Sequence, residues 1–217
     1  MGTLEQLCEA VVDGQASAAV AATKAGLEEA IPAQTLFDDG LMAAMRHVGH
    51  LFEIGEIYVP EMLVSAHAMT AALDVLRPQL VHQGVRSSGK VAIGTVKGDL
   101  HDIGKNLVAM MLQGSGFEVD DLGTDVYPER FVEAIRDGAE VVAMSALLTT
   151  TMTNMREVVE AICDAGLRER VGIVVGGAPL NEEFADAVGA DGYARDASSA
   201  VRAVEEILGR VRVANAH

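Results

Sequence analysis

The chain has 217 residues, of which half are hydrophobic and 4% aromatic, and its formal net charge is −16. The apolar fraction excludes a disordered chain, and the acidic balance disfavours binding to nucleic acid, which requires clustered Lys and Arg. No apolar run approaches the roughly 20 residues of a membrane span, and the first residues lack a basic signal region. Two distant cysteines indicate neither disulfides nor zinc, so we expect a cytoplasmic protein without membrane contact.

The first part of the chain, to about Gln83, is predicted to be helical throughout. Helices are expected over residues 3–12 and 16–30, over a third segment from Pro32 to Gly55, and over a fourth that opens at Pro60. Apolar residues recur every three or four positions in the third and fourth segments, which gives each one apolar face. Because the connections are short, the four helices should pack as an antiparallel bundle.

The second part alternates between short apolar runs and helical segments. Strands are expected at 91–96, 117–120, 141–145, 171–175 and 192–193, and helices at 103–113, 128–136, 152–165, 182–188 and 198–211. This alternation predicts an α/β fold, a flavodoxin-like, doubly wound parallel sheet of five strands with helices on both faces. The Gly/Ser-rich stretch 83–90 is the expected linker, so we predict a helical domain over 1–88 and a Rossmann-like domain over 89–217.

Three loops after predicted strands carry unusual residues, and ligands of open α/β sheets bind at that edge. They span residues 98–106, 145–151 and 176–179. In the first loop Asp99 can fix the tautomer of His101 and leave its other ring nitrogen free for a metal, while Gly104 lets a bulky group approach. The alternative is a surface loop with an incidental His and Asp pair. A phosphate-binding P-loop is disfavoured because Asn106 stands where Ser or Thr should be.

The motifs in these loops, taken in chain order, resemble the cobalamin-binding signature. They are D-x-H-x-x-G (Asp99, His101, Gly104), S-x-L (Ser145, Leu147) and G-G (Gly176, Gly177). The string GTVKGDLHDIGKN is similar to the corrinoid domain of cobalamin-dependent methionine synthase, and equally to small corrinoid proteins of methanol, methylamine, glycine betaine and aryl methyl ether methyltransferase systems. Residues 51–69 resemble the helical cap that precedes this domain in the family, so the resemblance covers nearly the whole chain.

The resemblance implies a corrinoid cofactor, cobalamin or methylcobalamin, with His101 as the lower axial ligand of the cobalt. Asp99 would bond the far nitrogen of His101, and Thr151 would continue this relay. The nucleotide tail would enter a slot between sheet and helices, in which glycines leave room because a Cβ would project into it. The residues implied to bind the cofactor are Gly98, Asp99, Leu100, His101, Asp102, Gly104, Ser145, Leu147, Thr149, Thr151, Gly176, Gly177 and Ala197, with Tyr58 and Met62 of the cap over the upper face.

The family further implies a methyl carrier without a complete active site of its own. One partner would be a substrate:corrinoid methyltransferase, a second would pass the methyl group to a pterin or thiol acceptor, and a third would be a reductive activator. The cap would have to swing aside on the linker 83–90 to admit them. Three alternatives are a mutase subunit, which would not need residues 1–83, a cobalamin-sensing regulator, for which a DNA-binding motif and Trp are missing, and a storage protein.

Overall fold

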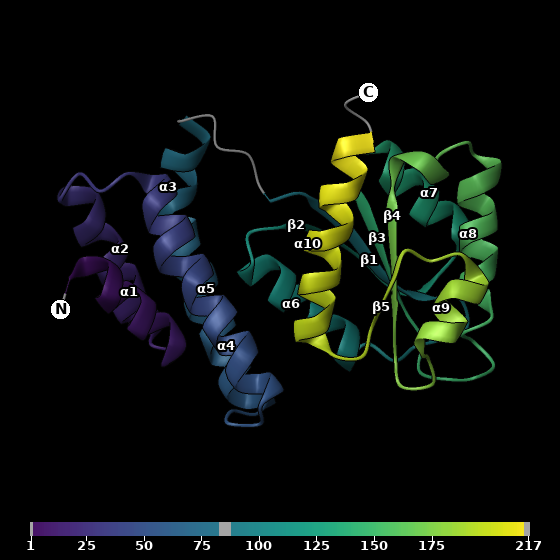
Figure 1. Cartoon of the computed structure of the whole chain (residues 1–217), viewed down its shortest axis with the longest axis horizontal. Coiled ribbons are helices and arrows are strands. Elements are labelled where there is room, and N and C mark those ends of the chain that lie inside the picture. The colour runs from purple at the N-terminus through teal and green to yellow at the C-terminus, as the bar shows by residue number, and fades with distance from the viewer. Residues whose placement is uncertain (1, 83–87, 215–217) are drawn as a thin grey trace. The chain divides into compact units, whose positions relative to one another are not determined.

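The computed structural model describes residues 2–82 and 88–214 and divides the chain into two compact units. One unit comprises Met1–Ser88 with Gln113–Gly116, and the other Gly89–Leu112 with Phe117–His217. Most of the expected linker, residues 83–87, lies outside the described residues, so the hinge remains a prediction. The two units are considered separately below (Figure 1).

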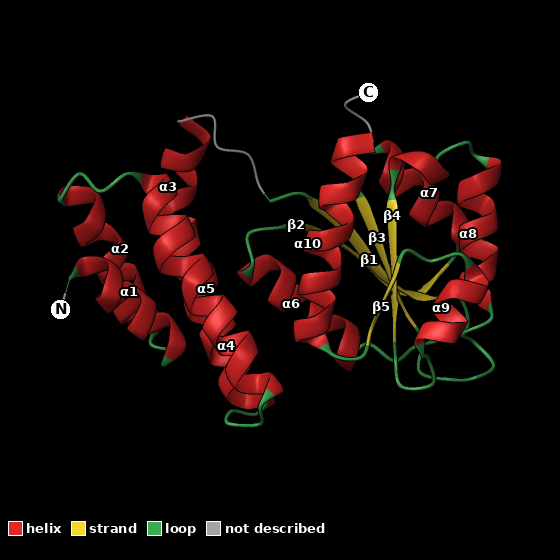
Figure 2. Cartoon of the chain, viewed as in Figure 1, coloured by secondary structure: helices red, strands yellow, loops and turns green. Residues whose placement is uncertain are grey.

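The first unit is helical, as expected (Figure 2). Its elements are α1 (Thr3–Val12), α2 (Ala16–Glu28), α3 (Ala33–Thr35), the π-helix η1 (Leu36–Met42), α4 (Ala43–Glu53) and α5 (Val59–His82). The expected third helix is therefore one helical stretch whose middle turns are wound as a π-helix. Pro60 lies in the first turn of α5, where its missing N–H breaks no helical hydrogen bond.

Helix α5 contains the segment Val59–Leu80, which by length and mean hydropathy (1.2) passes for a membrane span. This differs from the sequence-based expectation, because the helix continues past charged residues that interrupt a simple apolar run. The helix contacts α1, α2 and α4, and 39% of the segment is buried. Core helices often pass the same test, so the segment is weak evidence for a membrane span.

The second unit is the predicted α/β fold. Its elements are β1 (Lys90–Val96), α6 (Ile103–Gly114), β2 (Glu118–Val126), α7 (Pro128–Arg136), β3 (Val141–Ser145), α8 (Asn154–Asp164), the short helix η2 (Arg168–Arg170), β4 (Gly172–Gly176), α9 (Glu182–Val188), β5 (Gly192–Ala194) and α10 (Ala197–Ala214). All strand pairs are parallel, in the order β2-β1-β3-β4-β5. This is the flavodoxin-like order, which confirms the predicted fold class.

Both faces of the sheet are covered by helices, and the strands β1, β3 and β4 are buried along nearly their whole length. Alternate residues of β3 point to opposite sides: Val142 and Met144 pack with α7 and α8, whereas Val141 and Ala143 pack with α6 and α10. Strand β2 is longer than the expected 117–120 and carries two register shifts against β1. The added residues are mostly polar or half-buried, so a search for apolar runs does not find this extension.

Candidate functional site

The candidate site lies where the strand order reverses direction. Strands β1 and β3 are adjacent, but their following helices α6 and α8 cover opposite faces of the sheet. The carboxyl ends of β1 and β3 therefore form the switch point of the sheet, and doubly wound sheets bind ligands outside such a point. The loop after β1 carries Asp99 and His101, and the loop after β3 carries Leu147 and Thr151.

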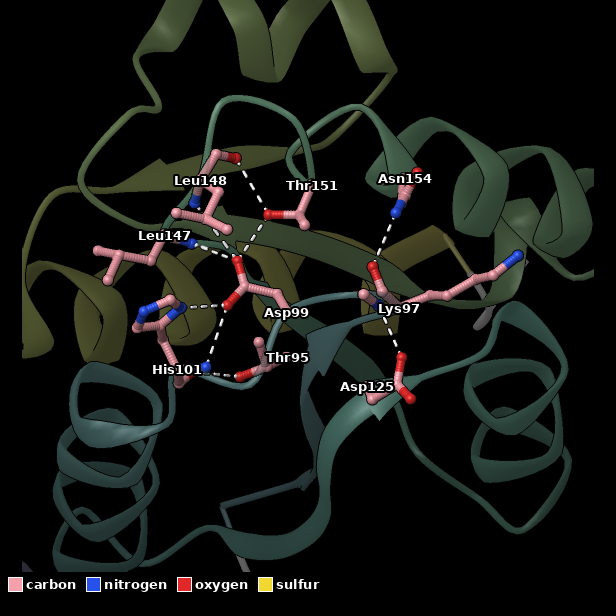
Figure 3. Close-up of polar contacts among 10 residues, drawn as sticks. Thr95, Lys97, Asp99, His101, Asp125, Leu147, Leu148, Thr151 and Asn154 are labelled. Atoms are coloured by element: carbon pink, nitrogen blue, oxygen red, sulfur yellow. Dashed lines mark hydrogen bonds and ion pairs between the residues drawn. The ribbon is translucent and has the colours of Figure 1, made fainter.

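Asp99 is the centre of the polar network at this switch point (Figure 3). Its side chain is fully buried, and each carboxylate oxygen accepts hydrogen bonds from a different loop. Oδ1 accepts the backbone N–H of His101 at 3.0 Å and lies 2.7 Å from the Nδ1 of that ring. Oδ2 accepts the Thr151 hydroxyl at 2.6 Å and the backbone N–H groups of Leu147 and Leu148 at 2.8 and 3.3 Å. One carboxylate thus ties the β1 and β3 loops together.

This network keeps Asp99 ionised. Burial alone would raise the pKa of its carboxyl group, but the hydrogen bonds from Thr151, Leu147 and His101 outweigh burial and hold the pKa well below its usual range. A carboxylate has no proton to donate, so the contact with His101 requires a proton on Nδ1. In the neutral ring Nε2 is then the unprotonated nitrogen, the one able to bind a metal.

His101 presents that nitrogen outward. Its side chain is 51% exposed although its Nδ1 side is fixed, and among the described residues no protein group bonds Nε2. The backbone of His101 is held as well, because its carbonyl accepts the hydroxyl of the fully buried Thr95 at 2.9 Å. No group of three or more His, Cys, Asp or Glu side chains able to hold a metal ion occurs in the described part of the chain. The site therefore offers one imidazole ligand, which fits a metal whose other ligands come from its own macrocycle.

Other residues predicted for the site lie on the loops after β1 and β3 or at the end of β3. Leu100 and Leu147 are exposed (73% and 43%) and offer apolar side chains beside His101, and Thr149 is exposed on the β3 loop. Ser145 is the half-buried last residue of β3. Asp102 accepts a hydrogen bond from Asn106 across the first turn of α6 at 3.1 Å.

Three further predicted residues belong to other segments of the chain. Ala197 is the buried first residue of α10. Tyr58 and Met62 belong to the helical unit, Tyr58 68% exposed and Met62 fully buried, and their place over a cofactor stays a prediction.

The glycines of the site serve two different purposes. A Cβ at Gly104 would meet nothing within 4 Å, so this position is open, and its expected role in leaving room for a ligand stays a prediction. A Cβ at Gly176 would lie 2.9 Å from the Ala194 carbonyl oxygen, and one at Gly177 would lie 1.8 Å from that of Ala146. The expected reason for the G-G pair was therefore incomplete, because the protein's own backbone already excludes a side chain there.

Sequence reasoning missed several members of the network. The backbone N–H groups of Leu147 and Leu148 bind Asp99, a role that no residue type reveals. Thr95, a buried hydroxyl in an apolar strand, was the one available signal. Lys105 does not point to a phosphate, since its Nζ bonds Asp121 and Asn106 at 2.6 Å, in agreement with the rejection of a P-loop.

Comparisons with known proteins agree with this geometry. Residues 89–202 match a family described as a B12 binding domain, and residues 3–77 match a second family with the same description. Dimethylamine corrinoid protein 2 of Methanosarcina acetivorans is 41% identical over 207 residues, which cover 94% of this chain and 95% of the relative.

Two solved structures resemble the whole chain. A cobalamin-binding protein from Desulfitobacterium hafniense is 32% identical with a TM-score of 0.80, covering 94% of this chain and 97% of the other. The methanol:cobalamin methyltransferase complex from Methanosarcina barkeri contains a chain that is 28% identical with a TM-score of 0.82, covering 95% and 80%.

Proposed function

Because the chain belongs to the family of cobalamin-binding corrinoid proteins of methyltransferase systems, we propose that it carries a methyl group between two methyltransferases. A bound corrinoid supplies a cobalt that accepts and releases the methyl group. The chain's own residues would bind the cofactor, supply one ligand to the cobalt and fix the tautomer of that ligand. The methyl donor is brought by a substrate-specific methyltransferase, and a second methyltransferase hands the group to a pterin or thiol acceptor.

The observation that carries this proposal is the exposed Nε2 of His101 behind a buried, ionised Asp99. The carboxylate orients the ring and, in the neutral imidazole, places the proton on Nδ1 and leaves Nε2 as the ligating nitrogen. Thr151 donates its hydroxyl to Asp99 at 2.6 Å, and the same hydroxyl lies 3.0 Å from the Leu148 carbonyl. We assign His101 as the lower axial ligand and Asp99 and Thr151 as the groups that adjust its bond to cobalt.

A methylamine is the donor class that we propose first. The relative at 41% identity is named for dimethylamine, whereas the neighbour in the methanol complex is less similar at 28%. The recognition of the donor lies with the partner enzyme. The second partner and a reductive activator belong to the same proposal, because a carrier must be unloaded and its cobalt kept reduced.

Two measurements test the proposal. The first reconstitutes the protein with cobalamin whose lower base is labelled with nitrogen-15, reduces it to Co(II), and records the EPR spectrum. A nitrogen-14 splitting that disappears in His101→Ala is expected, and a nitrogen-15 splitting in the parent would contradict the axial role of His101.

The second measurement supplies carbon-14 methylamines or methanol together with the matching substrate:corrinoid methyltransferases. Close to one labelled methyl group per protein from dimethylamine, and none in His101→Ala, is expected. Loading from methanol alone would contradict the donor class, and no loading from any donor would contradict the carrier function.

A further inference from the structure

The carboxylate that orients His101 leaves the sheet from a tight turn at the end of β1. The Asp99 N–H donates to the Val96 carbonyl at 3.1 Å, which closes a four-residue turn. The third residue of this turn, Gly98, has φ +80°, the value that a type II turn has at this position and that favours glycine. This turn therefore sets the direction of the Asp99 side chain.

Asp125, near the end of β2, holds the turn from two sides (Figure 3). Its carboxylate Oδ1 accepts the Gly98 N–H at 2.6 Å, and its own N–H donates to the Asp99 carbonyl at 3.0 Å. A third bond comes from α8, where Asn154 donates to the Lys97 carbonyl at 2.7 Å. The segment Gly98–Asp99 is therefore held at both ends, at the N–H of Gly98 and at the carbonyl of Asp99, by one residue of a neighbouring strand.

The backbone at Asp125 is adapted to this contact. Its φ is +54°, in the left-handed region that aspartate and asparagine tolerate better than most residues. Along β2, Gly123 to Val126 spans three steps, while the paired stretch Gly94 to Val96 on β1 spans two, so β2 carries an extra residue here. The Asp125 side chain is exposed, so core packing does not explain its position.

We propose that Asp125 is a positioning residue for the axial ligand, acting through the backbone of Gly98 and Asp99 on the ring of His101. This inference rests on the proposed role of His101 as the cobalt ligand. Asp125 itself bonds the turn and not the imidazole. Loss of its acceptor frees the Gly98 peptide, and the Asp99 carboxylate then holds the ring less firmly.

A matched control separates this role from a general effect on stability. Asp191 also binds a backbone N–H with its carboxylate, that of Ile173 at 2.7 Å, and also pairs with Arg168. Asp191 precedes β5 and Ile173 is the second residue of β4, so this contact lies at the amino ends of the strands, the opposite edge of the sheet. Asp191→Gly makes the same chemical change away from the site.

The test measures how firmly the protein's histidine holds cobalt. The Co(II) protein is titrated with nitrogen-15 imidazole, and the midpoint is the concentration that replaces half of the nitrogen-14 EPR splitting. Asp125→Gly keeps the backbone angle without strain and is expected to lower the midpoint about tenfold, the equivalent of one lost hydrogen bond to a charged group. Asp125→Asn, which keeps an acceptor oxygen, should stay close to the parent, as should Asp191→Gly.

Three results would overturn the inference: a parent-like midpoint in Asp125→Gly, an equal fall in Asp191→Gly, or an Asp125→Asn protein as weak as the glycine variant. If Asp125→Gly does not fold, Asp125→Ser, whose hydroxyl is too short to reach Gly98 in the same way, replaces it and must also lower the midpoint.

Amide hydrogen exchange in the apoprotein distinguishes this inference from the proposed function. The Gly98 amide should be protected in the parent and exchange faster in Asp125→Gly, independently of any cofactor. An unprotected Gly98 amide in the parent would refute the positioning role of Asp125 while leaving His101 as ligand. A protected amide combined with a parent that lacks the nitrogen-14 splitting would refute the axial assignment, and with it the positioning role.

Discussion

Oδ1 of Asp99 lies 2.7 Å from Nδ1 of His101 and also accepts the backbone N–H of His101 at 3.0 Å. A single oxygen therefore fixes both the main chain and the ring of the same residue. The imidazole cannot rotate about its side-chain bonds without breaking a charge-assisted hydrogen bond in a buried setting. This arrangement keeps one nitrogen aimed outward before any cofactor binds.

Asp99→Asn should destabilise the apoprotein although the amide has nearly the same shape. Both carboxylate oxygens accept hydrogen bonds, so an amide places its NH₂ group against donors on one side. We expect a loss of about 1–3 kcal/mol in the free energy of unfolding, measured by urea denaturation.

Asp102→Asn is the matched control in the same loop. Asp102 accepts one side-chain bond, from Asn106, which an amide oxygen can also accept. Its free energy of unfolding should stay within about 0.5 kcal/mol of the parent. Equal losses in the two variants would show that the loop tolerates Asn poorly for another reason.

Thr151→Val removes the shortest bond to Asp99 while keeping the volume of the side chain. Thr151 is buried, so no bulk water replaces the lost donor, and we expect a loss of about 1–3 kcal/mol in apoprotein stability. Thr151→Ser retains the hydroxyl and should recover most of this loss. A Thr151→Val apoprotein as stable as the parent would contradict the stabilising role of the Thr151 hydroxyl.

Gly104→Ala and Gly177→Ala should separate binding from folding. At Gly104 the added methyl group meets nothing within 4 Å, so the apoprotein should keep its stability, while cobalamin affinity falls about tenfold or more if the cofactor approaches this backbone. The two quantities are measured by urea denaturation and by spectroscopic titration with cobalamin. Unchanged affinity in Gly104→Ala would place the cofactor elsewhere.

At Gly177 the methyl group would overlap the Ala146 carbonyl oxygen, and φ is +137°. The apoprotein should therefore lose about 3 kcal/mol or more. A stable Gly177→Ala apoprotein would contradict the packing reason for this glycine.

Asp196 should make the stability of the α/β unit depend on pH. Burial would raise the pKa of its carboxyl group, but hydrogen bonds from Ser199 and Arg195 outweigh burial and lower the pKa. A lowered native pKa means that the stabilisation is complete above the unfolded value of about 3.9 and is lost as pH falls below it.

The free energy of unfolding should therefore fall between about pH 6 and about pH 3 by more in the parent than in Asp196→Asn. Asparagine still caps α10, so the two proteins should differ by less than about 1 kcal/mol at the higher pH. Parallel pH curves for parent and variant would contradict the assignment.

The fold could be predicted from the sequence because its signals are local. Strands such as Val141–Ser145 are short apolar runs, and helices such as Pro128–Arg136 show one apolar face after a proline. Strand β2 was predicted too short because polar residues interrupt the apolar ones beyond Asp120, and the strand shifts its register against β1 twice there. A bulge changes the pairing between two strands, so the pattern of residues within one strand does not predict it.

The sequence by itself determined the order of elements, the motif residues Asp99 and His101 and the family that they indicate. Only the tertiary structure decided which atoms hold Asp99, since the N–H groups of Leu147 and Leu148 lie about fifty residues away and carry no side-chain signature. It also decided that Gly177 is fixed by the Ala146 carbonyl and that Asp125 braces the Gly98 turn. Backbone groups are the same in every residue, so their partners become known only when distant strands are brought side by side.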